Sequence, residues 1–162
     1  MKGIFNFMEF NEGKFNKIKE KAGRIYSEKK KIFCPYFGFV VVLNSDGFHH
    51  LQFSDRRERS KSEQFLKFSL LPLALKVINK SGTVQEVRKT MQPVGKKGRD
   101  GFRIVKDVHY WAFIAIVGDD KKIKIKTILK KIGEGNVIFW SVMPCSSLKN
   151  GQKLYSVNIE DE

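Results

Sequence analysis

Hydrophobic residues recur along this chain with two different periods, a helical one in the first half and a strand-like one in the second. Apolar residues three or four positions apart predict a helix that Asn11 can cap and that includes Tyr26. A capping box at Ser60 and Glu63 predicts a second, hydrophobic helix, which Pro72 should kink or divide into two. Apolar, β-branched and aromatic runs predict extended segments at 37–43, 48–53, 83–89, 102–106, 109–117, 123–129 and 137–143.

This order of elements, with helices first and a run of strands afterwards, is typical of an α+β protein. The sequence predicts a single domain over residues 1–162, in which N-terminal helices pack on a roughly four-stranded antiparallel sheet. The helical part should occupy about 11–80 and the sheet about 83–145. Residues 146–162, which end in three acidic side chains, are expected to form a loose tail.

The composition adds a strong charge imbalance, because 31 Lys and Arg residues against 17 Asp and Glu residues give a net charge of +14. Such a surface attracts polyanions, and RNA is the partner that it predicts, with a generally basic proteome or a membrane-surface role as the alternative. Cys34 and Cys145 follow no metal-binding spacing, so a cytoplasmic protein without a metal or other cofactor is expected. The short apolar N-terminus, interrupted by Glu9 and Glu12, predicts neither a signal peptide nor a membrane span.

Basic residues gather in two neighbouring parts of the predicted sheet. Lys122, Lys124 and Lys126 alternate with apolar residues and therefore project from one side of a strand. The preceding loop and strand carry a second basic group, which consists of Lys96, Lys97, Arg99 and Arg103. If the strands pair as a meander, both groups share a face or a rim that can follow a phosphate backbone, although a polar strand face is often simply solvated.

The strongest predicted strand, residues 109–117, carries aromatic side chains on both faces. His109 and Trp111 share one face, and Tyr110 lies on the other. One set must belong to the core, where most aromatic rings lie, and the other can reach the basic surface and stack on an unpaired base. The pattern leaves open which face is buried, and we include His109 and Trp111 among the candidate substrate-binding residues.

A group of residues suited to proton transfer lies between the two predicted helices, where His49 and His50 are followed closely by Arg56, Arg57 and Arg59. A histidine can exchange protons near neutral pH, and arginines can hold a phosphate and its developing charge. RNA cleavage needs little more, since a base must deprotonate the attacking 2′-hydroxyl and an acid must protonate the leaving 5′-oxygen. The alternative is a solvated surface beside a charged helix cap. A zinc site is disfavoured, because adjacent histidines on an extended chain point in opposite directions.

Signatures of several other chemistries are missing from the chain. It contains no GxxxxGK[ST], no GxSxG, no HExxH and no GxGxxG after a strand. The clustered carboxylates of two-metal nucleases are also hard to find, which disfavours a magnesium-dependent DNase.

Three local runs accompany this architecture: His49-His50-Leu51 followed by Arg56-Arg57, residues 109–112 (His-Tyr-Trp-Ala), and residues 139–144 (Phe-Trp-Ser-Val-Met-Pro). Together with helices packed on a four-stranded antiparallel sheet, they resemble the barnase–EndoU–colicin–RelE-like RNases, especially phage-associated and toxin-type members. The resemblance implies metal-independent cleavage of RNA, by an enzyme that an acidic antitoxin or inhibitor protein often restrains. It also implies that His50, or its rival His49, is the acid or base, that Arg56 and Arg57 stabilise phosphate, and that Ser141 contacts substrate.

The leading hypothesis is therefore a small, metal-independent, toxin-type endoribonuclease. The second is a non-catalytic RNA- or DNA-binding module that uses the same lysine strand and aromatic side chains. The third is an interaction domain for an acidic protein. Replacement of the catalytic histidine separates the first two hypotheses, and the salt dependence of binding helps with the third.

Overall fold

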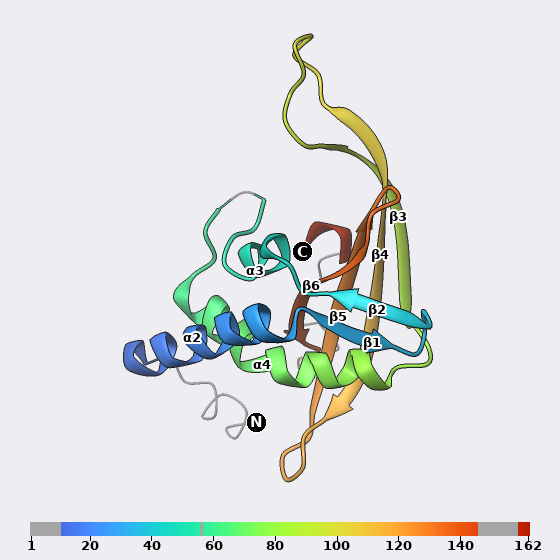
Figure 1. The fold of residues 1–162 in the computed structure, drawn as a ribbon. Coiled ribbons are helices and arrows are strands. Elements are labelled where there is room, and N and C mark those ends of the chain that lie inside the picture. Colours follow the sequence, from blue (N-terminus) through green and yellow to red (C-terminus); the bar gives the residue numbers. More distant parts are fainter. Residues whose placement is uncertain (1–10, 56, 146–158) are drawn as a thin grey trace, which may run out of the picture.

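The computed structural model describes residues 11–55, 57–145 and 159–162 and confirms the α+β class. Its sheet has the strand order β1-β2-β6-β5-β4-β3 (Figure 1). The strands are β1 (Lys31–Cys34), β2 (Phe39–Val42), β3 (Glu86–Val94), β4 (Ile104–Val117), β5 (Ile123–Ile132) and β6 (Val137–Pro144). Neighbouring strands are antiparallel except for β2 and β6, which pair in parallel through Val42 and Ile138.

The prediction of a four-stranded antiparallel sheet is thus correct for the β3–β6 meander and wrong for the whole sheet. The β1–β2 hairpin extends the meander to six strands and makes the sheet mixed. Strand β1 was not predicted, because it has only four residues and its first residue belongs to a lysine run that also fits the end of the helix. The helix ends at Lys30, whose φ of 51° turns the chain into β1.

Helices α2 (Glu12–Lys29) and α4 (Lys61–Lys80) agree with the two predicted helices. Helix α2 packs on α4, and α4 packs against the sheet (Figure 1). The side chain of Asn11 accepts a hydrogen bond from the amide of Lys14, and that of Ser60 accepts one from Glu63. Pro72 lies inside the single helix α4, so the division at this residue was a wrong prediction. Buried side chains lie both before and after the proline, and their packing holds the helix together.

The prediction of an extended segment at 48–53, between β2 and α4, is wrong, because helix α3 (Ser45–His50) occupies its first half. The side chain of Asn44 accepts a hydrogen bond from the amide of Gly47 at 3.0 Å and so caps the start of this helix. A Cβ atom at Gly47 would lie 2.3 Å from the carbonyl oxygen of Phe139, so only glycine lets α3 approach β6 this closely.

Both faces of the sheet are covered over part of β4. On the helix side, Phe113 and the neighbouring residues of β5 and β6 pack against α4 in the main core. On the opposite face, Tyr110 is 2% exposed and belongs to a smaller core together with Ile128 and Ile159. This arrangement answers the question that the sequence left open: Tyr110 is buried, and Trp111 lies half-buried at the edge of the main core.

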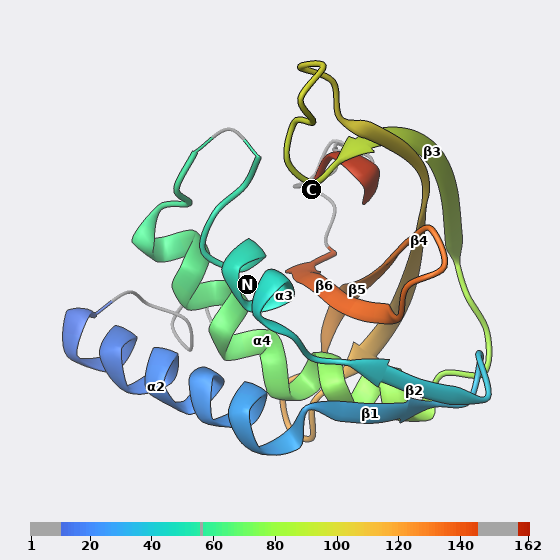
Figure 2. The same ribbon diagram turned by 45° about the horizontal axis from the view of Figure 1, so that its top comes forward.

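The smaller core depends on the C-terminal residues, which form the short 3₁₀ turn η1 (Ile159–Asp161). Figure 2 shows this turn inside the curve of the sheet, next to β3 and β4. Ile159 is 2% exposed, so the expectation of a loose tail is wrong for the last four residues. The remainder of the predicted tail, 146–158, lies outside the described residues.

Candidate functional site

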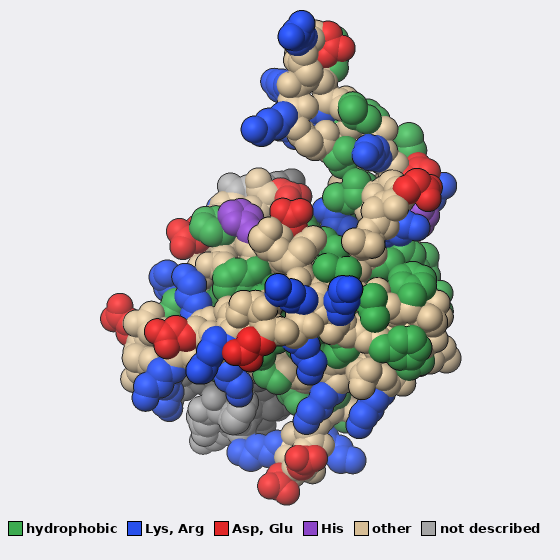
Figure 3. All heavy atoms as spheres, in the orientation of Figure 1, with side chains coloured by type: hydrophobic (Ala, Val, Ile, Leu, Met, Phe, Trp, Pro, Cys, Tyr) green, Lys and Arg blue, Asp and Glu red, His purple; other side chains and the backbone are tan. Residues whose placement is uncertain are grey.

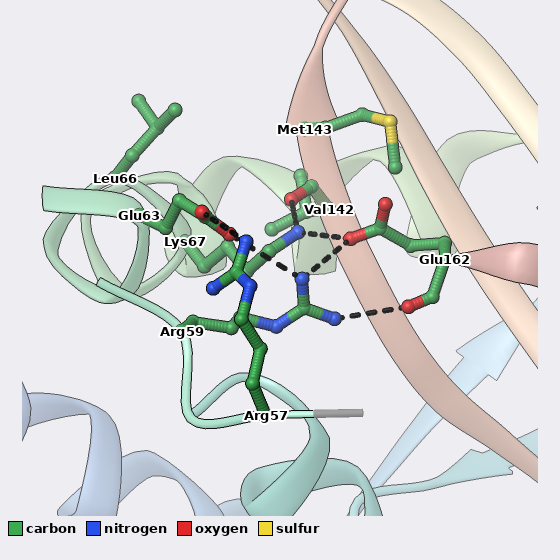
Figure 4. A pocket seen from close by; sticks show the side chains of 8 residues that line it. All are labelled: Arg57, Arg59, Glu63, Leu66, Lys67, Val142, Met143 and Glu162. Atoms are coloured by element: carbon green, nitrogen blue, oxygen red, sulfur yellow. Dashed lines mark hydrogen bonds and ion pairs between the residues drawn. The ribbon is translucent and has the colours of Figure 1, made fainter. Parts of the chain in front are cut away.

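Charged side chains from three parts of the chain meet where α4 packs against β6. They border a cavity of about 250 Å³, whose lining residues are Arg57, Arg59, Glu63, Leu66, Lys67, Val142, Met143 and Glu162 (Figure 4). We call Arg59, Lys67, Ser141 and Glu162 the buried charge cluster. Three of these residues carry charges and lie far from bulk water, which requires that each finds partners inside the protein.

Arg59 comes from the loop that precedes α4, and its side chain is only 6% exposed. Its Nε atom donates to the carbonyl oxygen of His50 at 3.0 Å, and its Nη2 atom donates to the main-chain oxygen of Glu162, also at 3.0 Å. Its Nη1 atom forms ion pairs with the carboxylates of Glu63 at 3.6 Å and Glu162 at 3.4 Å. The guanidinium therefore joins the α3–α4 loop, the first turn of α4 and the C-terminal turn.

Lys67 lies on the sheet-facing side of α4, and its ammonium group has three partners. It donates to the Ser141 hydroxyl at 2.9 Å, to the carbonyl oxygen of Val142 at 3.1 Å and to Oε1 of Glu162 at 2.5 Å. Ser141 in turn donates to the same Glu162 oxygen at 3.2 Å. The side chains of Lys67 and Glu162 are 6% and 8% exposed, so this ion pair is largely shielded from water.

Lys67 and Glu162 each affect the pKa of the other. Burial lowers the pKa of Lys67, and the carboxylate of Glu162 opposes that effect. Burial alone would raise the pKa of Glu162, but Lys67 and Arg59 outweigh it and hold the pKa of the carboxyl below its ordinary value. Glu162 is therefore an ionised acceptor for three donors that come from three different elements.

His50 lies beside this cluster and is 4% exposed. Its ring stacks on Trp140 with 3.9 Å between the ring centres, and its Nε2 atom lies 3.2 Å from Nη2 of Arg59. Because a guanidinium only donates, Nε2 accepts and the imidazole is neutral. Burial, with the positive charges of Arg59, Lys67 and Lys130, lowers the pKa of His50 to about 2. In this arrangement His50 has no proton to give at neutral pH.

The other residues predicted around this site are placed less deeply. His49 is exposed and stacks on Phe53 with 4.5 Å between the ring centres. Arg57 borders the cavity and pairs with Glu63 at 3.1 Å. Glu63 was expected only to complete the capping box, but its carboxylate holds Arg57 and Arg59 instead. Arg56 lies outside the described residues.

The predicted substrate-binding residues do not share one surface. Lys96, Lys97, Arg99 and Arg103 are exposed on the loop between β3 and β4, which projects from the body of the molecule. Figure 3 shows Lys and Arg side chains on this projection, which we call the basic arm. The register of β4 and β5 places Lys124 and Lys126 on the sheet face opposite to Trp111. These lysines and the Trp111 ring therefore cannot contact a ligand from the same side of the sheet.

The basic strand face also differs from the expectation in its details. Lys122 and Lys124 are exposed, whereas Lys126 donates to the carboxylate of Glu86 at 2.9 Å. Lys130, on the same face, places its ammonium 3.8 Å from the ring centre of Trp140, the ring on which His50 stacks. This face therefore leads from exposed lysines to the neighbourhood of the buried charge cluster.

The rings of the opposite face form a separate aromatic surface. His109 stacks on Trp111 with 5.7 Å between their centres, and Trp111 meets Phe37 edge-on at 4.9 Å. Phe37 also contacts Phe39, which is 49% exposed. These rings are accessible to a ligand, but they are on the other side of the sheet from Lys130.

Sequence reasoning placed Ser141 in the site and considered Arg59, but it missed Lys67 and Glu162. One signal for Lys67 was present: it recurs with Gln64, Phe68 and Leu71 at the spacing of a single helix face. A charged residue on an otherwise apolar helix face needs an internal partner. No local sequence pattern identifies Glu162 as that partner.

Comparison with protein-family models, with curated proteins and with solved structures gives no match. In the part of the chain that the structure describes, no three His, Cys, Asp or Glu side chains are grouped as a metal-ligand set. Among the same residues, no helix is long and apolar enough to cross a membrane. A functional argument for this chain therefore rests on the geometry of its own side chains.

Proposed function

We propose that this protein is a metal-independent endoribonuclease that holds the scissile phosphate at the buried charge cluster. One observation carries this proposal: two buried cations, Arg59 and Lys67, line one cavity. The His50 imidazole lies 3.2 Å from Arg59, and the Ser141 hydroxyl lies 2.9 Å from Lys67. Arg59 and Lys67 supply the positive charge that a phosphate and its pentacovalent transition state require. Their burial strengthens these interactions, since water screens them less.

The chemistry assigned to these groups is a transfer within the RNA backbone. The 2′-oxygen attacks the adjacent phosphorus while His50 Nε2 takes the hydroxyl proton, and the bond from phosphorus to the 5′-oxygen breaks. Lys67 gives a proton to that leaving oxygen, so the products are a 2′,3′-cyclic phosphate and a 5′-hydroxyl. The negative charge of a bound phosphate would raise the pKa of His50, whose present value reflects the cations around it.

Exposed lysines would guide the RNA toward this site. Lys124 and Lys122 lie on the strand face that leads to Lys130, and the basic arm projects beyond the same sheet. Cations in such positions attract a phosphate backbone without reading its sequence. The net charge of +14 fits this role.

A non-catalytic RNA-binding module is the second candidate, and one observation favours it. The Nε2 atom of His50 is engaged by Arg59 at 3.2 Å, and the pKa of about 2 makes the imidazole a weak base. An acidic protein, such as an inhibitor, is the third candidate ligand for the same positive surface.

Incubation of the purified protein with RNA in excess EDTA separates these candidates. The comparison uses His50→Asn and, as the matched control on the adjacent residue, His49→Asn. We expect cleavage with cyclic-phosphate ends by the wild type and by His49→Asn, and a loss of about 100-fold or more in His50→Asn. RNA that is shifted on a gel but left intact by all three proteins would favour the binding module. Neither cleavage nor a shift would favour an acidic protein partner.

A further inference from the structure

The carboxylate of Glu162 has the surroundings of a bound ligand rather than those of an ordinary surface residue. Its Oε1 atom accepts from Lys67 of α4, and Arg59 of the preceding loop lies 3.4 Å away (Figure 4). The hydroxyl of Ser141 in β6 donates to the same oxygen. Its side chain is 8% exposed although it belongs to a four-residue segment at one end of the described chain. The three donors belong to α4, to β6 and to the loop before α4.

A carboxylate and a phosphate oxygen make the same demands on such donors. Both are anionic acceptors that bind ammonium, guanidinium and hydroxyl groups through short, charge-assisted hydrogen bonds. If Glu162 left, Lys67 would keep only the Ser141 hydroxyl and the carbonyl oxygen of Val142, and its buried charge would have no counterion. Arg59 would retain Glu63 at 3.6 Å. A buried ammonium without a counterion is unfavourable, so the vacated position would take up another anion.

The segment that carries Glu162 is attached by contacts separate from the carboxylate. Ile159 packs in the smaller core, and Glu160 lies 3.8 Å from Arg88 of β3. Arg59 also holds the main-chain oxygen of Glu162 at 3.0 Å. These contacts place the carboxylate at the cluster with a high effective concentration, as a tethered ligand would be.

We infer that Glu162 is an internal competitor, whose carboxylate occupies the position of a substrate phosphate at Arg59, Lys67 and Ser141. The inference rests on the proposed function in taking phosphate as the external ligand. It adds that phosphate binding and RNA cleavage are restrained in the wild type by the protein's own C-terminal segment.

The test compares Glu162→Gln with the wild type and with Asp161→Asn, a matched change of the exposed carboxylate next to it. Each protein is titrated with inorganic phosphate at neutral pH and constant ionic strength, and the affinity is followed by calorimetry and by the rise in melting temperature. We expect Glu162→Gln to bind phosphate on the order of tenfold more tightly than the other two, because the competing anion is gone. Equal phosphate affinities in all three proteins would overturn the inference.

A measurement on the wild type decides the matter if Glu162→Gln fails to fold. Excess phosphate should displace the carboxylate and shift the backbone amide resonances of Ile159 and Glu162 in nitrogen–proton NMR spectra, whereas chloride should not. Phosphate-induced shifts confined to the basic arm would contradict the proposal.

RNA cleavage in EDTA by the same variants keeps this inference separate from the proposed function. Faster cleavage by Glu162→Gln than by Asp161→Asn supports both. Equal cleavage together with equal phosphate affinity overturns the competitor and leaves the ribonuclease standing. Tighter phosphate binding by Glu162→Gln without cleavage by any protein supports the competitor and overturns the ribonuclease.

Discussion

The basic arm and the buried charge cluster both present cations, but they do so in opposite physical settings. In the arm, Lys96, Lys97 and Arg99 are exposed on a projecting loop, and their charges are hydrated. In the cluster, Arg59 and Lys67 are 6% and 5% exposed and share the carboxylate of Glu162. Water and salt screen the first group, whereas the second is shielded from both.

This difference separates attraction from positioning. Exposed cations raise the rate of encounter with a polyanion but hold no particular atom of it, because their side chains rotate freely. Buried cations are fixed by hydrogen bonds and can stabilise charge at one point. A molecule that combines the two can collect an anionic chain at its surface and place one phosphate inside. Three changes, ordered by expected size, test this division.

The largest effect should come from Lys67→Met, which keeps most of the length of the side chain and removes its charge. Glu162 would then lose its closest buried partner, so we expect the free energy of unfolding to fall by about 3 kcal/mol. Denaturant unfolding measures this value. The control Lys76→Met changes an exposed lysine of the same helix and should alter stability by less than about 0.5 kcal/mol. Similar losses in both variants would contradict the distinction between the two settings.

A smaller effect should appear in the dependence of stability on pH. Burial lowers the pKa of His50 from 6.5 to about 2. Below pH 6.5 the histidine is therefore protonated in the unfolded chain but stays neutral in the folded protein. This stabilising contribution is fully present above the ordinary pKa and is lost as the pH falls. Between pH 6.5 and pH 5, the unfolding free energy should drop by about 1.6 kcal/mol.

Denaturant unfolding at these two pH values tests the assignment to His50. The loss should persist in His49→Gln, whose ring is exposed, and disappear in His50→Gln. Glu162 does not interfere in this window, because its unfolded pKa of 4.5 lies below it. A flat profile for the wild type between the two pH values would mean that His50 takes up a proton inside the folded protein.

The smallest effect on free energy should follow neutralisation of the basic arm by replacing Lys96, Lys97, Arg99 and Arg103 with Gln. RNA affinity at moderate salt should fall about tenfold, and the slope of affinity against salt should decrease by up to about 3. Filter binding at several salt concentrations measures both quantities, while stability should stay within about 0.5 kcal/mol.

The matched control removes the same number of charges from the exposed face of α2, by replacing Lys14, Lys17, Lys21 and Arg24 with Gln. If the arm contacts RNA, this control should change the salt slope much less than the arm variant does. Equal changes would show that only the net charge matters and that the arm has no special place in binding.

Local signals in the sequence predicted the elements that carry their own pattern. The capping box began α4 at Lys61, and the alternation around Ile125 placed β5 correctly. Helix α3 was missed because its formation depends on Gly47 packing against Phe139, a contact with a strand far along the chain. The buried charge cluster was predictable only in part for the same reason, since Lys67 and Glu162 meet through tertiary structure. The candidate site is thus formed by tertiary contacts, which local sequence patterns do not reveal.

The parallel pairing of β2 with β6 has a consequence for the order in which the protein can form. Val42 pairs with Ile138, so the β1–β2 hairpin has no neighbour in the sheet until β6 has been synthesised, almost a hundred residues later. Contacts between residues so far apart in sequence form slowly, because a long loop must close before they gain any energy. During that interval Phe37 lacks its contact with Trp111, and α3 lacks the strand that Gly47 approaches. A ribosome-bound nascent chain would therefore expose aromatic surface and carry an unformed site until its last strand emerges.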